Sequence, residues 1–248
     1  MEAYSAFAYV YDKLMKDVDY EKWTNYIEDI FKRYGVIPKN MAELACGTGN
    51  LTNKLVGRGY NLIGVDCSED MLSVAQEKAM DVSEGSVIYL NQDMRELFLP
   101  TELDAILCVC DGMNYITKDE EITKIFKSVY EHLKSGGLFI FDVSSYYKLS
   151  TILGQNTYAE NYEGVSYIWE NYFDETKNIC DFDLTIFVKE GKIYKKYEEN
   201  HKQRAHKENE IIENLKNAGF EKINVFDAFG FEEPKENSER IYFVCKKM

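Results

Sequence analysis

The residues with the clearest chemical potential lie together in one short run of the sequence, Glu43-Leu44-Ala45-Cys46-Gly47-Thr48-Gly49. An apolar lead-in, two glycines separated by one residue and the start of an amphipathic segment predict a strand, a tight turn and the N-terminus of a helix. Glycine lets backbone N–H groups approach a ligand with no Cβ in the way, and the first amides of a helix lack partners within it. The run therefore predicts a ligand-binding turn.

The residues after the turn narrow the choice of ligand. A phosphate-binding loop of the Walker type would end in Gly-Lys-Ser/Thr, and this sequence instead has Thr52, Asn53 and Lys54 there, so that loop is excluded. A dinucleotide-binding fingerprint fits Gly47 and Gly49 but requires its third glycine at the position of Thr52. A nicotinamide dinucleotide therefore remains an alternative on this motif alone.

Two further acidic residues stand where a nucleoside-bearing cofactor would need them. Asp66 lies 17 residues beyond Gly49, close to the ~20 at which a Rossmann-like unit places an acid on the ribose hydroxyls. Asp93 and Met94 suit an adenine, because a carboxylate accepts from its amine and a thioether packs on its ring. The alternatives are a capping role for Asp66 beside Ser68, and a surface aspartate with a core methionine for the second pair.

Strands that alternate with helices must position these residues. The strand-like apolar runs after the turn cover residues 61–66, 86–90, 103–110 and 138–143. Helical patterns separate them, and the last of these helices is expected to close at Ser135-Gly136-Gly137. Such alternation is typical of a parallel sheet with helices on both faces, where ligands bind beyond the carboxyl ends of the strands. Four carboxylates are expected at that edge: Glu43, Asp66, Asp93 and Asp111.

The pattern differs before and after this region. Residues 1–40 predict a helical cap, whose first helix has an apolar face of Tyr4, Phe7, Ala8 and Tyr11. Its tyrosines either close over a bound cofactor or pack on the domain.

Segments 166–173, 179–188 and 193–200 are rich in β-branched and aromatic residues and predict an antiparallel meander. We expect a cofactor-binding Rossmann-like domain of residues 41–150 and 205–248, with residues 151–204 inserted as a β substrate subdomain.

Composition limits the partners and the compartment. The chain has 248 residues and a net charge of −14, which disfavours binding to DNA or RNA because no basic face is segregated from the acidic residues. No apolar run approaches the ~20 residues of a membrane helix, and the N-terminus lacks signal-peptide features. The six cysteines lack the CxxC spacing of zinc or redox sites. We therefore expect a cytoplasmic protein with reduced thiols that binds neither membrane nor nucleic acid.

Successive motifs resemble those of class I S-adenosylmethionine (SAM)-dependent methyltransferases. They are the turn at 43–49, with Ala45 where most members have glycine, and Gly64-Val65-Asp66-x-Ser68-x-x-Met71-Leu72, Asp93-Met94-Arg95 and Lys134-Ser135-Gly136-Gly137-Leu138. The opening Tyr4-x-x-Phe7-Ala8-x-x-Tyr11 is similar to the cap of a bacterial small-molecule-like subgroup. The resemblance implies a three-layer, Rossmann-like α/β fold with a seven-stranded sheet. It implies cofactor binding by Tyr11, Glu43, Ala45, Cys46, Gly47, Gly49, Asp66, Cys67, Met71, Asp93, Met94 and Cys110.

The expected activity is transfer of a methyl group from SAM to a nitrogen or oxygen of a small-molecule acceptor. Such a transfer mainly requires alignment of the acceptor, and a protonated acceptor also needs a base. The catalytic candidates are Asp111, Tyr115 and His201, and the substrate-binding candidates are Arg204 and His206; structural roles remain open for all five. No metal site is predicted, and we expect a monomer or homodimer. An NAD-dependent oxidoreductase and a non-catalytic SAM-binding regulatory module are the alternatives.

Overall fold

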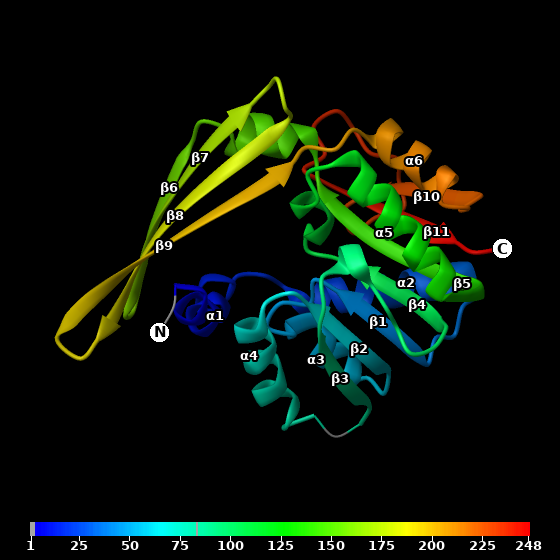
Figure 1. Ribbon diagram of the computed structural model, residues 1–248, viewed down its shortest axis with the longest axis horizontal. Helices are drawn as coiled ribbons and strands as arrows, with labels where there is room; N and C mark the ends of the chain where they lie inside the picture. The colour runs from blue at the N-terminus through cyan, green and yellow to red at the C-terminus, as the bar shows by residue number, and fades with distance from the viewer. Residues whose placement is uncertain (1–2, 83) are drawn as a thin grey trace.

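The computed structural model describes residues 3–82 and 84–248, and the side chains of residues 3–7 and 9 lie outside the description. The expected apolar face of Tyr4 and Phe7 therefore falls outside the described side chains. Seven strands form one sheet in the order β10-β11-β5-β4-β1-β2-β3, and four form a second sheet in the order β6-β7-β8-β9 (Figure 1). The predicted α/β fold with a seven-stranded sheet and an antiparallel meander is confirmed.

The large sheet brings the ends of several strands to one edge. Its strands are β1 (Asn40–Leu44), β2 (Asn61–Asp66), β3 (Ser86–Asn91), β4 (Leu103–Cys108), β5 (Leu133–Ser144), β10 (Lys222–Asp227) and β11 (Arg240–Lys246). The first five run parallel to one another, whereas β11 is antiparallel to both β5 and β10. Since Arg240 is in register with Ser144, the start of β11 lies at the carboxyl end of β5.

Helices cover both faces of this sheet. The α-helices are α1 (Ala3–Leu14), α2 (Tyr20–Tyr34), α3 (Asn50–Val56), α4 (Glu69–Ala79), α5 (Asp119–His132) and α6 (Glu208–Asn217). α2 and α3 contribute to a core on one face with Met41 and Ile140, and α5 and α6 contribute to a core on the other with Phe139 and Phe141. Adjacent β5 side chains thus enter opposite cores, as expected for strands buried on both faces. None of the helices in the described part of the chain is long and apolar enough to cross a membrane.

Local sequence signals account for the ends of the helices. Asp19 caps α2 by accepting a hydrogen bond from the Lys22 amide (3.0 Å), and Gly35 ends that helix with φ +63°. Ser68 caps α4 by accepting from the Met71 amide (3.3 Å). The second of these caps begins α4 directly after β2, so Asp66 is held at the edge where ligands bind.

Two boundaries differ from the sequence prediction. β4 ends at Cys108 rather than Cys110, because Cys110 (φ +59°) and Asp111 (φ +57°) adopt the left-handed conformation and turn the chain out of the sheet. β5 begins at Leu133 rather than Leu138. The Gly136 amide donates to the Lys247 carbonyl (2.8 Å), and the Lys247 amide donates to the Gly137 carbonyl (3.0 Å). These two hydrogen bonds hold the glycine pair in the strand. The predicted helix end at these glycines was therefore placed too late.

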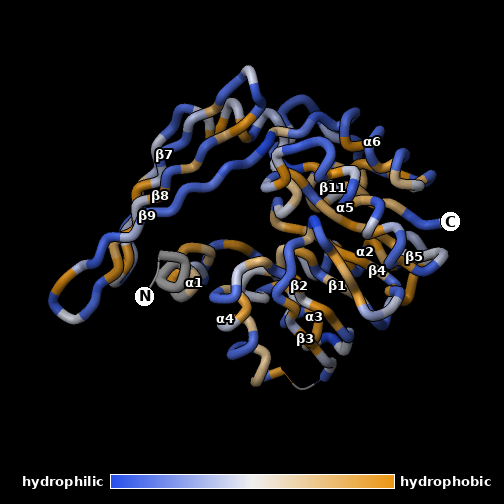
Figure 2. Tube along the Cα trace, viewed as in Figure 1, coloured by the Kyte–Doolittle hydropathy of each residue, from blue (hydrophilic) through white to orange (hydrophobic). Residues whose placement is uncertain are grey.

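The second sheet is an antiparallel meander that projects from the main domain (Figure 1). Its strands are β6 (Thr157–Tyr162), β7 (Val165–Asp174), β8 (Ile179–Glu190) and β9 (Ile193–Arg204). The sequence predicted the last three and missed β6 as a separate strand. Figure 2 shows β9 as a largely hydrophilic strand. α1 packs against both α4 of the main domain and β9 of the meander, so it bridges the two sheets.

Candidate active site

The glycine turn is held by the carboxylate that ends the next strand. Gly47 (φ +54°) and Gly49 (φ +70°) both have backbone angles that L side chains rarely adopt, and the Gly47 amide donates to Oδ2 of Asp66 (2.8 Å). A Cβ on Gly49 would lie 2.5 Å from the Tyr89 hydroxyl, whereas a Cβ on Gly47 would meet open space. The turn is therefore packed against the protein at Gly49 and open at Gly47.

Asp66 keeps acceptor capacity after holding the turn. Its Oδ1 accepts from the Ser68 amide (2.9 Å) and its Oδ2 from the Gly47 amide, and burial raises the pKa of the carboxyl. An ionised carboxylate offers about four lone-pair sites, so acceptor capacity remains for a further donor. A ribose hydroxyl could use that remaining capacity.

Glu43 lies deeper, beneath the turn. Its side chain is 4 % exposed, and Oε2 accepts a short hydrogen bond from the Thr52 hydroxyl. Burial raises the pKa of this carboxyl to about 8, because the charged form loses its hydration and only hydroxyl and amide donors replace it. Glu43 is therefore mainly protonated at neutral pH.

The predicted adenine pair has a strong internal partner. The Arg95 Nε donates to both oxygens of Asp93 (2.9 Å each), and the Arg95 amide donates to Oδ1 (2.9 Å). These hydrogen bonds hold the pKa of Asp93 below its ordinary value. Met94 begins the short helix η1 (Met94–Glu96) and packs partly buried against the core.

A cavity of about 660 Å³ connects these residues with the meander. This volume falls within the range of pockets that enclose small ligands. All the predicted cofactor residues except Gly49 line it, together with Asp111, Tyr115 and His201. Its meander wall is formed by Tyr167, Trp169, Phe182, Leu184, His201 and Gln203. The structure thus brings the residues assigned to the cofactor and those assigned to catalysis into one space.

Asp111 is anchored by a network that joins the two sheets. Its Oδ1 accepts from Nη2 of Arg240 (2.7 Å), and its Oδ2 accepts from Nε2 of Gln203 on β9 (2.8 Å). Arg240 also pairs closely with Asp142, whose Oδ1 accepts from the Cys110 amide (2.7 Å). With both oxygens engaged, Asp111 is suited to orient its neighbours rather than to take a proton.

Tyr115 and His201 contact each other edge to face where they line the cavity. Tyr115 ends the short helix η2 (Gly112–Tyr115), and its ring centroid lies 6.0 Å from that of His201 at an interplanar angle of 86°. Burial lowers the pKa of His201, because the charged imidazolium loses its hydration. The imidazole is therefore neutral at pH 7 and able to accept a proton.

The structure places Arg204 and His206 outside this cavity. Arg204 pairs with Asp119 (2.8 Å) and Glu210 (3.4 Å), and its Nη1 donates to the Thr117 carbonyl. His206 is buried against the Met113 carbonyl (Nε2 to O, 3.2 Å), and burial lowers the pKa of its ring to about 4. Both side chains bind groups of the protein where the meander joins the large sheet, and neither lines the cavity. Their positions therefore disfavour the predicted binding of substrate.

Several cavity residues were not among the predictions. Among them are Tyr20, Trp23, Lys148, Gln203 and Arg240. A signal existed for Arg240, because an antiparallel last strand begins at the carboxyl edge of its parallel neighbour. Gln203 could have been found from its spacing of two residues after His201, which puts both side chains on one face of a strand. Burial lowers the pKa of Lys148, which stands where the short π-helix η3 (Lys148–Leu153) begins.

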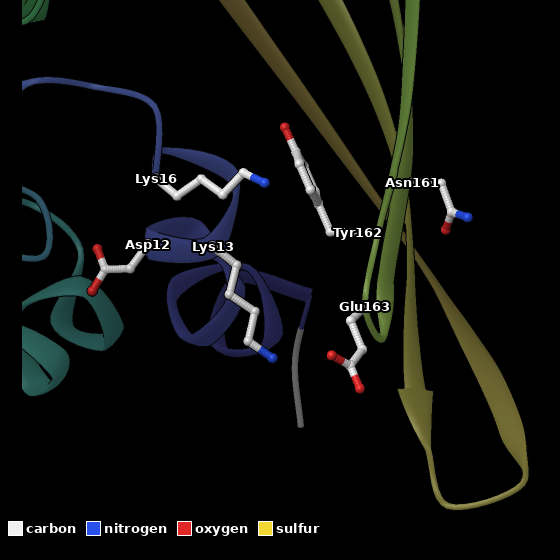
Figure 3. A pocket seen from close by; sticks show the side chains of 6 residues that line it. All are labelled: Asp12, Lys13, Lys16, Asn161, Tyr162 and Glu163. Atoms are coloured by element: carbon white, nitrogen blue, oxygen red, sulfur yellow. The ribbon is translucent and has the colours of Figure 1, made fainter.

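α1 ties the glycine turn to the meander. Asp12 accepts from the Thr48 hydroxyl (2.7 Å), the Asn50 amide group (2.8 Å) and the Lys78 ammonium (2.7 Å). On the other side, Nζ of Lys16 lies 4.0 Å from the ring centroid of Tyr162 on β6. Figure 3 shows these two side chains across an open hollow between α1 and the β6–β7 turn, with Asp12 directed the other way. Tyr11, the neighbour of Asp12, lines the main cavity.

The described residues include no group of three or more His, Cys, Asp and Glu side chains placed to hold a metal ion. The carboxylates at the cavity are instead paired with Arg240, Arg95, hydroxyls or backbone amides. A nucleoside cofactor fits this set better than a cation does, since its hydroxyls and amine supply hydrogen-bond donors.

The strand order itself defines the class of the protein. A sheet of five parallel strands extended by an antiparallel β11 beside β5, with a glycine turn after β1 and an acid at the end of β2, is the Rossmann-like sheet expected of a class I methyltransferase. The sequence profile described as "Methyltransferase domain" matches residues 41–137.

Comparison with known proteins identifies the family. The putative methyltransferase YqeM of Bacillus subtilis is 37% identical over 245 residues, which cover 98% of this chain and 97% of YqeM. The crystal structure of a SAM-dependent methyltransferase from Clostridium acetobutylicum has a TM-score of 0.87 and 37% identity, and the match covers 98% of each chain. KedS8 from Streptoalloteichus, a sugar N-methyltransferase, shares the fold with a TM-score of 0.78, at 16% identity over 96% of this chain and 92% of KedS8. The chain belongs to the family of SAM-dependent methyltransferases.

The family membership decides between the alternatives left open by the sequence. SAM is the methyl donor, and the chain is a methyltransferase enzyme rather than an NAD-dependent oxidoreductase or a regulatory module. A dinucleotide-binding turn would have its third glycine at the position of Thr52. In this structure Thr52 is buried and its hydroxyl donates to Glu43, which agrees with the choice of SAM over NAD. A methyl acceptor follows from the activity.

Proposed function

We propose that this enzyme transfers the methyl group of SAM to a nitrogen or oxygen of a small-molecule acceptor held between the large sheet and the meander. The observation that carries the proposal is the single cavity lined on one side by the glycine turn and on the other by the inner face of the meander. Residues 151–204 would then act as the substrate subdomain. An acidic chain and an enclosed, largely aromatic wall favour a small metabolite over a nucleic acid.

The donor would lie along the carboxyl ends of β1, β2 and β3. Asp66 would accept from the ribose hydroxyls, Asp93 and Met94 would contact the adenine, and the turn from Ala45 to Gly49 would hold the methionine portion. The remaining acceptor capacity of Asp66 and the open space beside Gly47 support these assignments. Tyr11 would close over the donor, supported by its place on the cavity wall next to Asp12, which is bonded to the turn.

The acceptor would approach from the meander side. Bound SAM supplies a methyl group activated by its sulfonium, so the protein's part is to align the acceptor and to exclude water. His201 would accept the proton that the attacking nitrogen or oxygen loses, because its imidazole is neutral and lines the cavity. Tyr115, in edge-to-face contact with His201, would help to orient the acceptor, and Asp111 would hold Gln203 and Arg240 in place.

The fold neighbours support an acceptor of this size. KedS8 is described as a sugar N-methyltransferase, and its fold matches 96% of this chain. At 16% identity the likeness concerns the fold, so the cavity of this chain rather than KedS8 carries the assignment.

The test is methyl transfer from SAM with a labelled methyl group to fractionated cell extract. We expect the label in the small-molecule fraction, and label found only in the protein or nucleic-acid fraction would overturn the proposal. In the same assay His201→Gln should lower kcat by about 100-fold, within the range for loss of a general base. Lys202→Gln, at the neighbouring exposed position of β9, is the matched control and should retain activity.

A further inference from the structure

One buried carboxylate of the meander, that of Glu199, lacks a hydrogen-bond partner among the described residues. Glu199 of β9 is 6 % exposed, and its Oε1 has no hydrogen-bond partner in the structure as described. No lysine or arginine of the described chain lies within ion-pair distance of it. The lysines nearby on β9 are engaged elsewhere, since Lys196 pairs with Glu198 (2.6 Å) and Lys202 pairs with Asp181.

The pairing of strands places Glu199 on the cavity side of the meander. Its direct neighbour on β8 is Leu184, and the direct neighbour of Leu184 on β7 is Trp169. Directly paired residues of antiparallel strands point to the same face, and Leu184 and Trp169 both line the cavity. His201, two residues along β9 and therefore on the same face, lines it as well. Glu199 thus points to the same side of the meander as these cavity-lining side chains and lies directly beside them, although it is not itself a lining residue.

The same face carries a second acceptor without a donor. Asn171 of β7 is 7 % exposed and donates through its amide nitrogen to the Asn156 carbonyl (3.0 Å), but its Oδ1 has no partner in the described structure. Asn171 lies in the row of His201, since Phe182 pairs with both. The wall therefore presents unpaired acceptors, and no cation of the described chain neutralises Glu199.

A buried, unpaired carboxylate is costly unless something supplies a positive charge or several donors. Burial raises the pKa of Glu199, which is the signature of that cost. An ammonium group would offset it with a charge-assisted hydrogen bond, and Trp169 would add a favourable contact between cation and ring. A neutral hydroxyl would satisfy the lone pair but leave the charge buried.

We propose that Glu199 and the surrounding meander wall form a binding site for a protonated amine of the methyl acceptor. The acceptor is thereby assigned to the class of amine-bearing small molecules. This assignment rests on the proposed function, because it takes the cavity to be the acceptor site. It adds a residue that neither the motif pattern nor the cavity lining singles out.

The probe is a matched pair of small ligands, cyclohexylamine and cyclohexanol, which differ in the ammonium group. Binding to the enzyme saturated with S-adenosylhomocysteine is followed through tryptophan fluorescence, since both tryptophans of the chain, Trp23 and Trp169, line the cavity. We expect the wild type to bind the amine at least tenfold more tightly than the alcohol. Glu199→Gln, which keeps the shape and removes the charge, should abolish that preference.

Glu198→Gln is the matched control, because Glu198 is the adjacent, exposed residue of the same strand. It should keep the preference for the amine. An equal affinity of wild type for both probes, or a preference that survives Glu199→Gln, would overturn the proposal. Thermal unfolding of each variant verifies that it is folded at the assay temperature. This experiment measures binding and not methyl transfer. A failure of methyl transfer to small molecules would therefore count against the proposed function alone, and the binding preference would still test the role of Glu199.

Discussion

Replacement of Glu43 by Gln should change how the stability of the enzyme depends on pH. Glu43 is almost completely buried beneath the glycine turn, and burial raises the pKa of its carboxyl from 4.5 to about 8. The folded chain therefore prefers the protonated carboxyl, whereas the unfolded chain ionises it at ordinary pH. The contribution of Glu43 to stability is fully present below pH 4.5 and is lost as the pH rises through about 8.

The magnitude follows from the two pKa values. A tenfold change in proton binding corresponds to ~1.4 kcal/mol, so complete ionisation in the folded state costs on the order of 5 kcal/mol. Between pH 5.5 and 8.5 the wild type should lose about 3 kcal/mol through Glu43 alone, with the remainder of that cost already incurred below pH 5.5. Gln keeps an oxygen that accepts from the Thr52 hydroxyl and has no charge to desolvate.

The assay is urea-induced unfolding of wild type and Glu43→Gln at pH 5.5 and 8.5. Other titrating groups, among them His201 and His206, are common to both proteins and cancel in the difference between them. The variant should gain about 3 kcal/mol relative to wild type on going to the higher pH. Glu77→Gln, at an exposed position on α4, should show a constant difference. If the stability difference between wild type and Glu43→Gln were the same at both pH values, the claim that burial raises the pKa of Glu43 would be refuted.

Two further predictions concern the glycine turn. Asp66→Asn should weaken SAM binding, measured by calorimetry, by about 10- to 100-fold, since a charged acceptor of hydrogen bonds contributes ~1.5–3 kcal/mol, whereas Glu69→Gln in the first turn of α4 should leave the affinity unchanged. An unaltered affinity in the Asp66 variant would return that residue to a purely structural role. Gly49→Ala should destabilise the enzyme by more than Gly59→Ala in urea unfolding, because both have positive φ but only the first adds a Cβ that meets the Tyr89 hydroxyl. Equal losses would show that strain alone matters at the turn.

The alternation of strands and helices could be predicted because each element is encoded locally. Apolar runs such as 61–66 and 138–143, and the caps at Asp19 and Ser68, lie within a few residues of the structure they specify. The order of the sheet then follows from few topological choices. The clustering of Glu43, Asp66 and the turn was predictable for the same reason, since carboxyl ends of neighbouring parallel strands share one edge.

The meander was harder to predict because its strands are partly hydrophilic. β6 has mostly exposed side chains, so its sequence carries little alternation and it was missed. On β9 the polar residues Glu199, His201 and Gln203 alternate with exposed ones, and the pattern alone does not reveal which side faces the cavity. That choice is made by α1 and by the bond from Gln203 to Asp111, residues far apart in the chain.

The departure at Ala45 shows the same limit at the scale of one methyl group. Ala45 adopts φ +53° in the turn where the resemblance implies glycine, and its Cβ occupies space that a different residue must leave free. Gly112 leaves it free, because a Cβ there would lie 2.9 Å from the Ala45 Cβ and 3.0 Å from the Cys108 sulfur. Ala45, which follows β1, and Gly112, which follows the neighbouring strand β4, are thus matched in size where they meet. Neither the alanine nor the glycine is informative by itself, since the constraint is the distance between them, which exists only once β1 and β4 are paired.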